Sequence, residues 1–296
     1  MSYSIVIAGS TERTKLCATA LVHDPRFSLQ AILTPSPKSI GRKQIVSKNA
    51  FHEWSEENQI PVHLVEKKID EKIRTDLETI HPKPDFLLVV DFGYIVPKWL
   101  LAWPSIAPVN IHPSALPKYR GSSPGQFVLM AGEKESAVSF IVMDEKLDHG
   151  PLITALPFTI KEDWTASDYY FKAFSLAQEK IGDILFEFAK HQESLPQPDE
   201  SPTPVAHMLT REDGFVPFET LLLSINTGKD AEKLYNRWRG LTPWPGIWTT
   251  VHIAGQEKRM KVLKTHIDGE KFVLDEVQVE GKNPTHFTLV QEQLDD

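Results

Sequence analysis

Residues 85–112 read DFLLVVDFGYIVPKWLLAWPSIAPVNIH, and this stretch decides the fold. Its apolar run over 86–90 is typical of a strand that is covered on both faces, as in a parallel sheet. We therefore predict strands over 85–90 and 108–111. Asn110 and His112 stand at the end of the second strand, where open α/β sheets place their ligand crevice.

Similar short apolar runs lie on both sides of this stretch, separated by helical patterns at 48–59 and 69–80. The further strands that we predict cover residues 5–8, 28–33, 61–65, 137–143 and 151–158. A long helix follows, with Thr165 as its predicted N-cap and Asp168 three residues later. Strands that alternate with helices predict βαβ units, and so an α/β domain with a Rossmann-like, mostly parallel sheet.

Residues 193–209 are rich in proline and polar side chains, which is a linker composition. We expect a catalytic domain over 1–192, this linker, and a second domain over 210–296. In the second domain, Asp230 and Gly240 are predicted to cap and stop a helix. Short alternating runs follow at 248–253, 260–263, 271–274 and 285–290. They predict a small β-barrel of the OB-like kind.

Composition limits the classes of protein to which this chain can belong. The 296 residues include one cysteine, so no intramolecular disulfide and no cysteine-based zinc site can form. The chain has no dinucleotide glycine fingerprint, no Walker A pattern and no His-Glu-x-x-His, so we expect no nucleotide cofactor and no metal. It has no signal peptide and no apolar span of membrane length, so we expect a cytoplasmic protein without a membrane partner, acting as a monomer.

Three polar residues are the first candidates for chemistry. Asn110 and His112 are two apart on a strand, so their side chains point the same way and can converge on one reacting atom. Asp148, in Leu147-Asp148-His149-Gly150, can orient His112 or accept a proton. The same aspartate before a glycine is also a common turn residue, and a histidine after a strand is often structural. Spacing alone leaves both interpretations open.

The run Asn110-Ile-His112, Ser114-Ala-Leu-Pro-Lys-Tyr-Arg-Gly121, then Asp148, resembles the formyltransferases that use 10-formyltetrahydrofolate. Among them it is most similar to the methionyl-tRNA formyltransferase family, over nearly the whole chain. The resemblance implies that Asn110, His112 and Asp148 are catalytic. It also implies a folate pocket formed by two segments, Phe92, Gly93, Tyr94, Ile95 and Ser114, Ala115, Leu116, Pro117.

The implied reaction is acyl transfer in translation initiation. The amino group of methionine on initiator tRNA would attack the formyl carbon of 10-formyltetrahydrofolate, with no metal. Asn110 and His112 would stabilise the oxyanion, while Asp148 would orient His112 and assist proton removal. 

The formal net charge of −8 argues against a polyanionic partner unless basic residues are clustered. Residues 205–264 hold nine Lys/Arg and six Asp/Glu, a net of +3, whereas residues 265–296 hold two Lys and eight Asp/Glu, a net of −6. The basic residues that we predict to contact tRNA are Arg42, Lys43, Lys118, Arg120, Arg237, Arg239, Arg259 and Lys261. By the resemblance, Arg42 and Lys43 lie where the family inserts a basic loop into the acceptor stem.

Three positions depart from the family pattern. His149 stands where the family usually has threonine, Asp91 stands where it has alanine or serine, and the segment 9–14 lacks the usual Thr-Pro-Glu-Phe. Two other functions stay open. The chain is either a formyltransferase for a small amine, such as an amino-sugar nucleotide or glycinamide ribonucleotide, or a non-catalytic RNA-binding protein on the same fold. The segment after Thr210 favours tRNA over small amines, and the intact Asn110, His112 and Asp148 favour catalysis.

Overall fold

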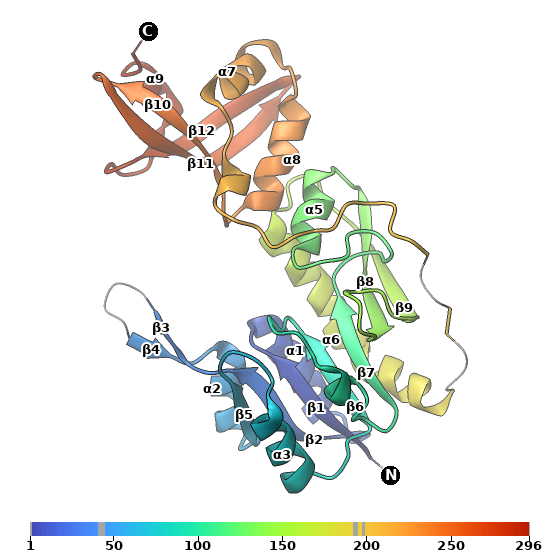
Figure 1. Ribbon diagram of the computed structural model, residues 1–296. Helices are drawn as coiled ribbons and strands as arrows, with labels where there is room; N and C mark the ends of the chain where they lie inside the picture. The colour runs from blue at the N-terminus through green and yellow to red at the C-terminus, as the bar shows by residue number, and fades with distance from the viewer. Residues whose placement is uncertain (1, 41–44, 192–194, 197–198, 296) are drawn as a thin grey trace. The chain divides into compact units, whose positions relative to one another are not determined.

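The computed structural model describes residues 2–40, 45–191, 195–196 and 199–295 (Figure 1). The predicted RNA contacts Arg42 and Lys43 lie outside these residues, as does part of the predicted linker. The Cα atoms group into two compact units. The first unit contains residues 1–120, 137–158 and 171–204, and the second contains 121–136, 159–170 and 205–296. Each unit is therefore built from three separate stretches of the chain. The domain boundary at 193–209 stays a prediction.

The first unit is built on a seven-stranded sheet in the order β5-β2-β1-β6-β7-β8-β9. The strands are β1 (Tyr3–Gly9), β2 (Phe27–Pro35), β5 (Val62–Val65), β6 (Phe86–Val90), β7 (Ala107–His112), β8 (Glu135–Val142) and β9 (Leu152–Thr159). All seven coincide with predicted strands. The pairs among β1, β2, β5, β6 and β7 are parallel, and β8 runs antiparallel to β7. The predicted Rossmann-like, mostly parallel sheet is confirmed.

Both faces of the sheet are buried at β6, as the apolar run over 86–90 predicts. On one face, Leu87 and Val89 share a core with Ile73 and Leu77 of α3 (Glu71–Ile80) and with Leu100 of α4 (Lys98–Leu101). Burying each such side chain contributes about 1.5–3 kcal/mol. This core explains why the run over 86–90 lacks the polar alternation of a half-exposed strand.

On the other face, aromatic rings join the sheet to α6 (Ala166–Lys190). Tyr3 meets Phe186 and Phe86 meets Phe188, with ring centroids 6.1 and 6.4 Å apart. Asp168 accepts hydrogen bonds from the backbone and hydroxyl of Thr165, which confirms the predicted start of α6. 

The elements that the sequence analysis did not predict are short or weakly amphipathic. They are α1 (Glu12–Val22), the antiparallel pair β3 (Lys38–Ile40) and β4 (Ile45–Ser47), α4, α5 (Pro124–Met130), α7 (Phe218–Thr227) and the 3-10 turn Glu212–Gly214. The predicted helix over 48–59 is α2 (Ala50–Glu57). Thr11 caps α1 by accepting from the Thr14 amide. The buried Cys17 lies on α1, and burial raises the pKa of its thiol, so it is an inert core residue.

The second unit contains an antiparallel sheet of β10 (Ile247–Ile253), β11 (Gln256–Asp268), β12 (Lys271–Val279) and β13 (Thr285–His286). This small β domain was predicted, with one error. The strand expected over 285–290 ends at His286 and becomes α9 (Phe287–Gln291). Phe287 and Val290 are both buried, and their spacing of three fits a helix as well as a short apolar run fits a strand.

The helix predicted over 230–239 is α8 (Ala231–Leu241), and its ends differ from the prediction. Asp230 is the N-cap residue but makes no capping hydrogen bond with its side chain. Gly240 lies inside the helix, not after it. A Cβ atom at Gly240 would lie 2.6 Å from the Gln126 carbonyl, so the glycine allows α8 to pack closely against α5.

Candidate active site

Asn110, His112 and Asp148 come together, as the sequence predicts. Asn110 is flanked in the sheet by Val89 of β6 and Ile141 of β8, and His112 is the last residue of β7. The Asn110 amide donates to Asp148 Oδ1 at 3.2 Å, and His112 Nδ1 lies 3.5 Å from the same oxygen. One carboxylate oxygen therefore serves both side chains at the carboxyl end of β7.

The His112 ring is fixed from both sides and is only 3% exposed. Its Nε2 atom lies 3.0 Å from the Tyr119 carbonyl oxygen. A carbonyl only accepts, so Nε2 carries the hydrogen in this contact. Nδ1 is therefore the ring atom that faces Asp148 and can gain or release a proton. This pair of atoms can take a proton from a nucleophile.

Asn110 retains further capacity for hydrogen bonding. An amide group has two N–H donors and a carbonyl acceptor, and only one donor is used by Asp148. Within the described part of the chain, the second N–H and the carbonyl oxygen of this half-buried amide have no hydrogen-bond partner. A donor held in place beside a proton acceptor is the arrangement needed to stabilise an oxyanion while a proton is removed.

The loop after β7 is held by the Ser139 side chain of β8. The Ser139 hydroxyl donates to the Ser114 carbonyl at 2.7 Å and accepts from the Leu116 amide at 3.3 Å. Ser114 and Leu116 are buried, whereas Ala115 and Pro117 are partly exposed. Of the predicted folate contacts in this loop, Ala115 and Pro117 are therefore those that a ligand can reach with the side chains as placed. The buried pair holds the loop in place.

The other predicted folate segment follows β6. The Tyr94 hydroxyl donates to the carbonyls of Val65 and Glu66 at 3.2 and 3.1 Å, and the rings of Phe92 and Tyr94 are 5.3 Å apart. These two rings pack against the core of the first unit. Gly93 and Ile95 are exposed, with Ile95 92% exposed. The exposed apolar Ile95 is suited to contact an aromatic ligand.

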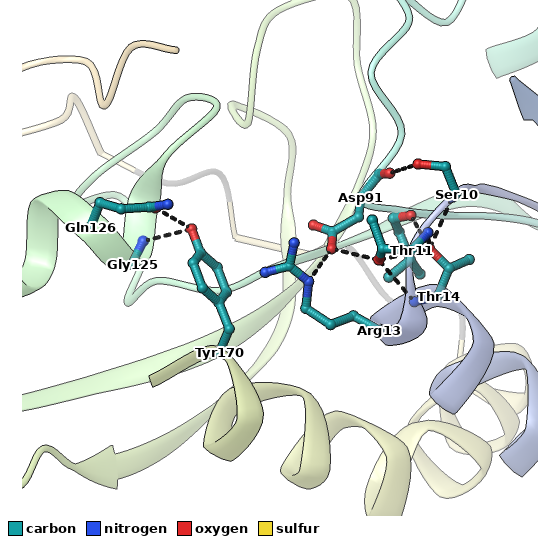
Figure 2. A network of polar contacts seen from close by, with 9 residues as sticks. Ser10, Thr11, Arg13, Thr14, Asp91, Gly125, Gln126 and Tyr170 are labelled. Atoms are coloured by element: carbon teal, nitrogen blue, oxygen red, sulfur yellow. Dashed lines mark hydrogen bonds and ion pairs between the residues drawn. The ribbon is translucent and has the colours of Figure 1, made fainter. Parts of the chain in front are cut away.

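A second polar network lies at the ends of β1 and β6, where the strand order reverses (Figure 2). Asp91 has φ 48° and its Oδ2 atom forms an ion pair with Arg13. The Thr11 hydroxyl donates to the same oxygen at 2.9 Å, and the Ser10 hydroxyl donates to the Asp91 carbonyl at 3.2 Å. Thr14 ties this turn to the end of β6 by donating to the Val90 carbonyl. Arg13 was not predicted from the sequence as part of a site.

Two departures from the family pattern thus meet in one ion pair. Asp91 and the segment 9–14 were each singled out in the sequence, but their pairing was not predicted. In the second unit, the Tyr170 hydroxyl donates to Gln126 Oε1 at 2.6 Å and accepts from the Gly125 amide at 3.2 Å (Figure 2). 

Two of the predicted tRNA contacts, Arg237 and Arg239, donate hydrogen bonds within the second unit. Arg239 is 2% exposed and donates to the carbonyls of Lys161 and Trp164 and to Asn236. Arg237 donates to the carbonyls of Asp213 and Phe215. Burial lowers the pKa of both guanidinium groups. These donors therefore hold the second unit together, and a contact of Arg237 or Arg239 with tRNA stays a prediction.

The other predicted basic contacts differ in their exposure and in the groups that they contact. Arg120 donates to the Asp199 carbonyl at 2.9 Å, and Lys118 is partly exposed. Lys261 is exposed on β11, and Arg259 lies over the Trp248 ring at 5.4 Å. Arg259 and Lys261 thus occupy neighbouring outward positions on one strand.

Neither a metal cluster nor a membrane span is found among the described residues. No group of three or more histidine, cysteine, aspartate or glutamate side chains there is placed to hold a metal ion. No helix there is long and apolar enough to cross a membrane.

Two family profiles match the chain. The one described as "Formyl transferase" covers residues 5–183, and the one described as "Formyl transferase, C-terminal domain" covers residues 223–282. The methionyl-tRNA formyltransferase of Clostridioides difficile is 29% identical over 272 residues, which cover 92% of this chain and 82% of that protein.

The names of solved structures of similar fold include two kinds of compound, methionyl-tRNA and an amino-sugar nucleotide. The methionyl-tRNA formyltransferase of Clostridium thermocellum has a TM-score of 0.60 at 16% identity, covering 94% of this chain and 99% of that one. The N-formyltransferase of Helicobacter canadensis, in complex with folinic acid and dTDP-3-aminofucose, has a TM-score of 0.57 at 18% identity, covering 93% and 95%. At these identities the similarity concerns the fold.

Proposed function

The chain belongs to the formyl transferase family of formyl-transferring enzymes, and from this we propose that it formylates methionyl initiator tRNA with 10-formyltetrahydrofolate as donor. The observation that carries the chemistry is the shared contact of Asn110 and His112 with Asp148 Oδ1. It combines an amide donor and a proton acceptor at the carboxyl end of β7. The reaction needs both.

The donor fits the residues around this contact. 10-Formyltetrahydrofolate supplies the formyl group on N10, which departs as an amine. Its ring system requires apolar surface, and the exposed Ile95, in the segment after β6, and the exposed Leu147, next to Asp148, offer it. We propose Phe92–Ile95 and Ser114–Pro117 as the folate-contacting segments. 

In the proposed mechanism the nitrogen of the acceptor amine forms a bond with the formyl carbon. Asp148 and His112 Nδ1 hold the proton that this nitrogen loses. The unused N–H of Asn110 donates to the developing oxyanion, a contribution of about 3–4 kcal/mol in comparable acyl-transfer sites. The carbon–N10 bond then breaks, and the proton held by Asp148 and His112 returns to N10 as it leaves.

A hollow in the second unit supports an RNA acceptor. Its volume is about 400 Å³, and its lining includes Trp248 and the basic residues Arg211, Lys258 and Arg259. Three glutamates also line it, so the hollow is not uniformly basic. We propose Arg259 and Lys261, together with Lys118, Arg120, Arg42 and Lys43, as contacts for tRNA phosphates. 

A small amine is the second candidate acceptor. The similarity in fold to the Helicobacter canadensis enzyme, whose complex contains an amino-sugar nucleotide, favours it. The match of residues 223–282 to the C-terminal domain profile and the 29% identity to a methionyl-tRNA formyltransferase favour tRNA. 

The deciding experiment measures formyl transfer from 10-formyltetrahydrofolate to charged initiator tRNA and, in parallel, to amino-sugar nucleotides. We expect turnover on the tRNA only, and turnover on the sugars alone would refute the proposed acceptor. Increasing salt should weaken tRNA binding, and Arg259→Ala should reduce the salt dependence by about one phosphate contact. Light scattering and cell fractionation test our expectation of a cytoplasmic monomer.

A further inference from the structure

The connection between β8 and β9 carries Asp148 and includes His149, which departs from the family pattern. Asp148 has φ 47°, the left-handed region that costs free energy for a residue with a Cβ atom. Its side chain is nevertheless nine-tenths buried, with its Oδ1 atom at the two catalytic contacts. The surrounding loop must therefore keep Asp148 in this conformation.

The Asp144 carboxylate closes this loop with both of its oxygens. Oδ1 accepts from the Lys146 backbone amide at 2.8 Å. Oδ2 lies 2.7 Å from Nδ1 of His149. A single side chain thus joins residues on the two sides of Asp148, and the contact with His149 is charge-assisted when the ring is protonated.

The two ends of the connection are fixed independently. The Val142 amide donates to the Pro151 carbonyl at 2.9 Å, and the Met143 amide donates to the Pro108 carbonyl at 2.8 Å. At Gly150 a Cβ atom would lie 1.8 Å from the Val142 carbonyl oxygen, so the backbone passes there without room for a side chain. Between these fixed ends, Glu145 forms an ion pair with Lys98 at 2.6 Å, and the Asp144 side chain makes the contacts within the loop.

We propose that Asp144 and His149 are positioning residues for Asp148. Their contact holds the loop so that the Asp148 carboxylate stays 3.2 Å from the Asn110 amide and 3.5 Å from His112 Nδ1. Losing the contact lets Asp148 leave the left-handed region and turn its carboxylate away. This inference rests on the proposed catalytic role of Asp148.

The first test measures kcat and KM for the folate donor, with the amine that the acceptor assay identifies. His149→Ala should lower kcat about 10-fold with little change in KM, since a charge-assisted hydrogen bond is lost. His149→Asn places an amide donor near the position of Nδ1, and we expect it to recover most of the lost kcat. A wild-type kcat in His149→Ala, or no recovery in His149→Asn, would overturn the proposal.

The chain contains a matched control for this test. His266 and Asp275 of the second unit form the same Nδ1 to Oδ2 contact, at 2.9 Å, between β11 and β12. His266→Ala should leave kcat unchanged. An equal loss of kcat in His266→Ala would show that breaking any such surface pair is enough, and would overturn the proposal.

A double-mutant cycle separates positioning from a general loss of structure. In an Asp148→Ala background, His149→Ala should cause no further loss of kcat, because there is no carboxylate left to position. A further 10-fold loss in that background would overturn the proposal. If Asp148→Ala alone keeps wild-type turnover, the catalytic assignment of Asp148 fails, and the positioning role fails with it.

Discussion

Asp91 and Asp148 have nearly the same backbone conformation, with φ 48° and 47°, and both lie beyond the carboxyl ends of sheet strands. Their partners differ. Asp91 forms an ion pair with the Arg13 guanidinium and accepts from Thr11. An amide and an imidazole approach Asp148.

The difference teaches that the charge partner, not the backbone, decides what each carboxylate can do. A guanidinium never gives up its proton in a protein, so the charge of Asp91 stays neutralised and its contribution is to structure. An imidazole nitrogen can accept a proton and give it back, so the carboxylate beside His112 can take part in proton transfer. The following predictions test this contrast.

The largest expected effect comes from replacing each aspartate with glycine. Glycine adopts positive φ readily, so the substitution removes the carboxylate with little backbone cost. Asp148→Gly should lower kcat by roughly 10²–10⁴-fold, the usual contribution of a positioned acid or base. Asp91→Gly should keep kcat close to the wild-type value. Steady-state formyl transfer measures both, and equal losses in the two variants would remove the contrast.

The next effect comes from deleting one donor to each carboxylate. Asn110→Ala should lower kcat by about 10²–10³-fold, as expected for an oxyanion donor. Thr11→Ala removes the donor to Asp91 and the cap of α1, so it should lower stability by about 1 kcal/mol while kcat is kept. A kcat for Asn110→Ala at the wild-type level would exclude an oxyanion role for this amide.

A smaller effect is expected from breaking the ion pair itself. The side chains of Arg13 and Asp91 are 33% and 20% exposed, so water screens their attraction in part. Arg13→Gln should lower the free energy of unfolding by about 1 kcal/mol, measured by urea denaturation. Asp91→Asn should then add little to Arg13→Gln. A fully additive second loss would mean that the two residues do not act as a pair.

The smallest effect concerns the Ser10 hydroxyl, which donates to the Asp91 carbonyl at 3.2 Å. Ser10→Ala should lower the free energy of unfolding by only about 0.5 kcal/mol, because one neutral hydrogen bond is lost from a partly exposed site. The same urea titration measures it. A loss larger than that of Arg13→Gln would show that the backbone of Asp91, not its charge, holds this turn.

The sheet and the meeting of Asn110, His112 and Asp148 were predicted well from the sequence, for a physical reason. Buried parallel strands are continuous apolar runs, and residues at strand ends meet at one edge of the sheet, so Asn110 and His112 could be placed from local pattern. Asp148 was predicted because it completes the family motif that begins with Asn110 and His112. The left-handed backbone of Asp148 and the hydrogen bonds of Asp144 within the loop depend on three-dimensional contacts. The local sequence pattern did not predict either feature.

Charge patterns were less informative than apolar patterns. Arg239 counted as part of a basic cluster, but its donors meet the carbonyls of Lys161 and Trp164, more than 70 residues earlier in the chain. The pairing of Arg13 with Asp91 joins residues that are equally distant in sequence. A single sequence states which charges exist, whereas folding decides which of them are buried or paired.

The most direct test of the central claim is a single-turnover rate of formyl transfer for wild type, Asn110→Ala, His112→Ala, Asp148→Ala and the triple variant. If the three side chains act as one unit, the triple variant should be about as slow as the slowest single variant, since effects within such a unit are not additive. Losses that multiply across the three substitutions, or a triple variant with wild-type rate, would contradict the account.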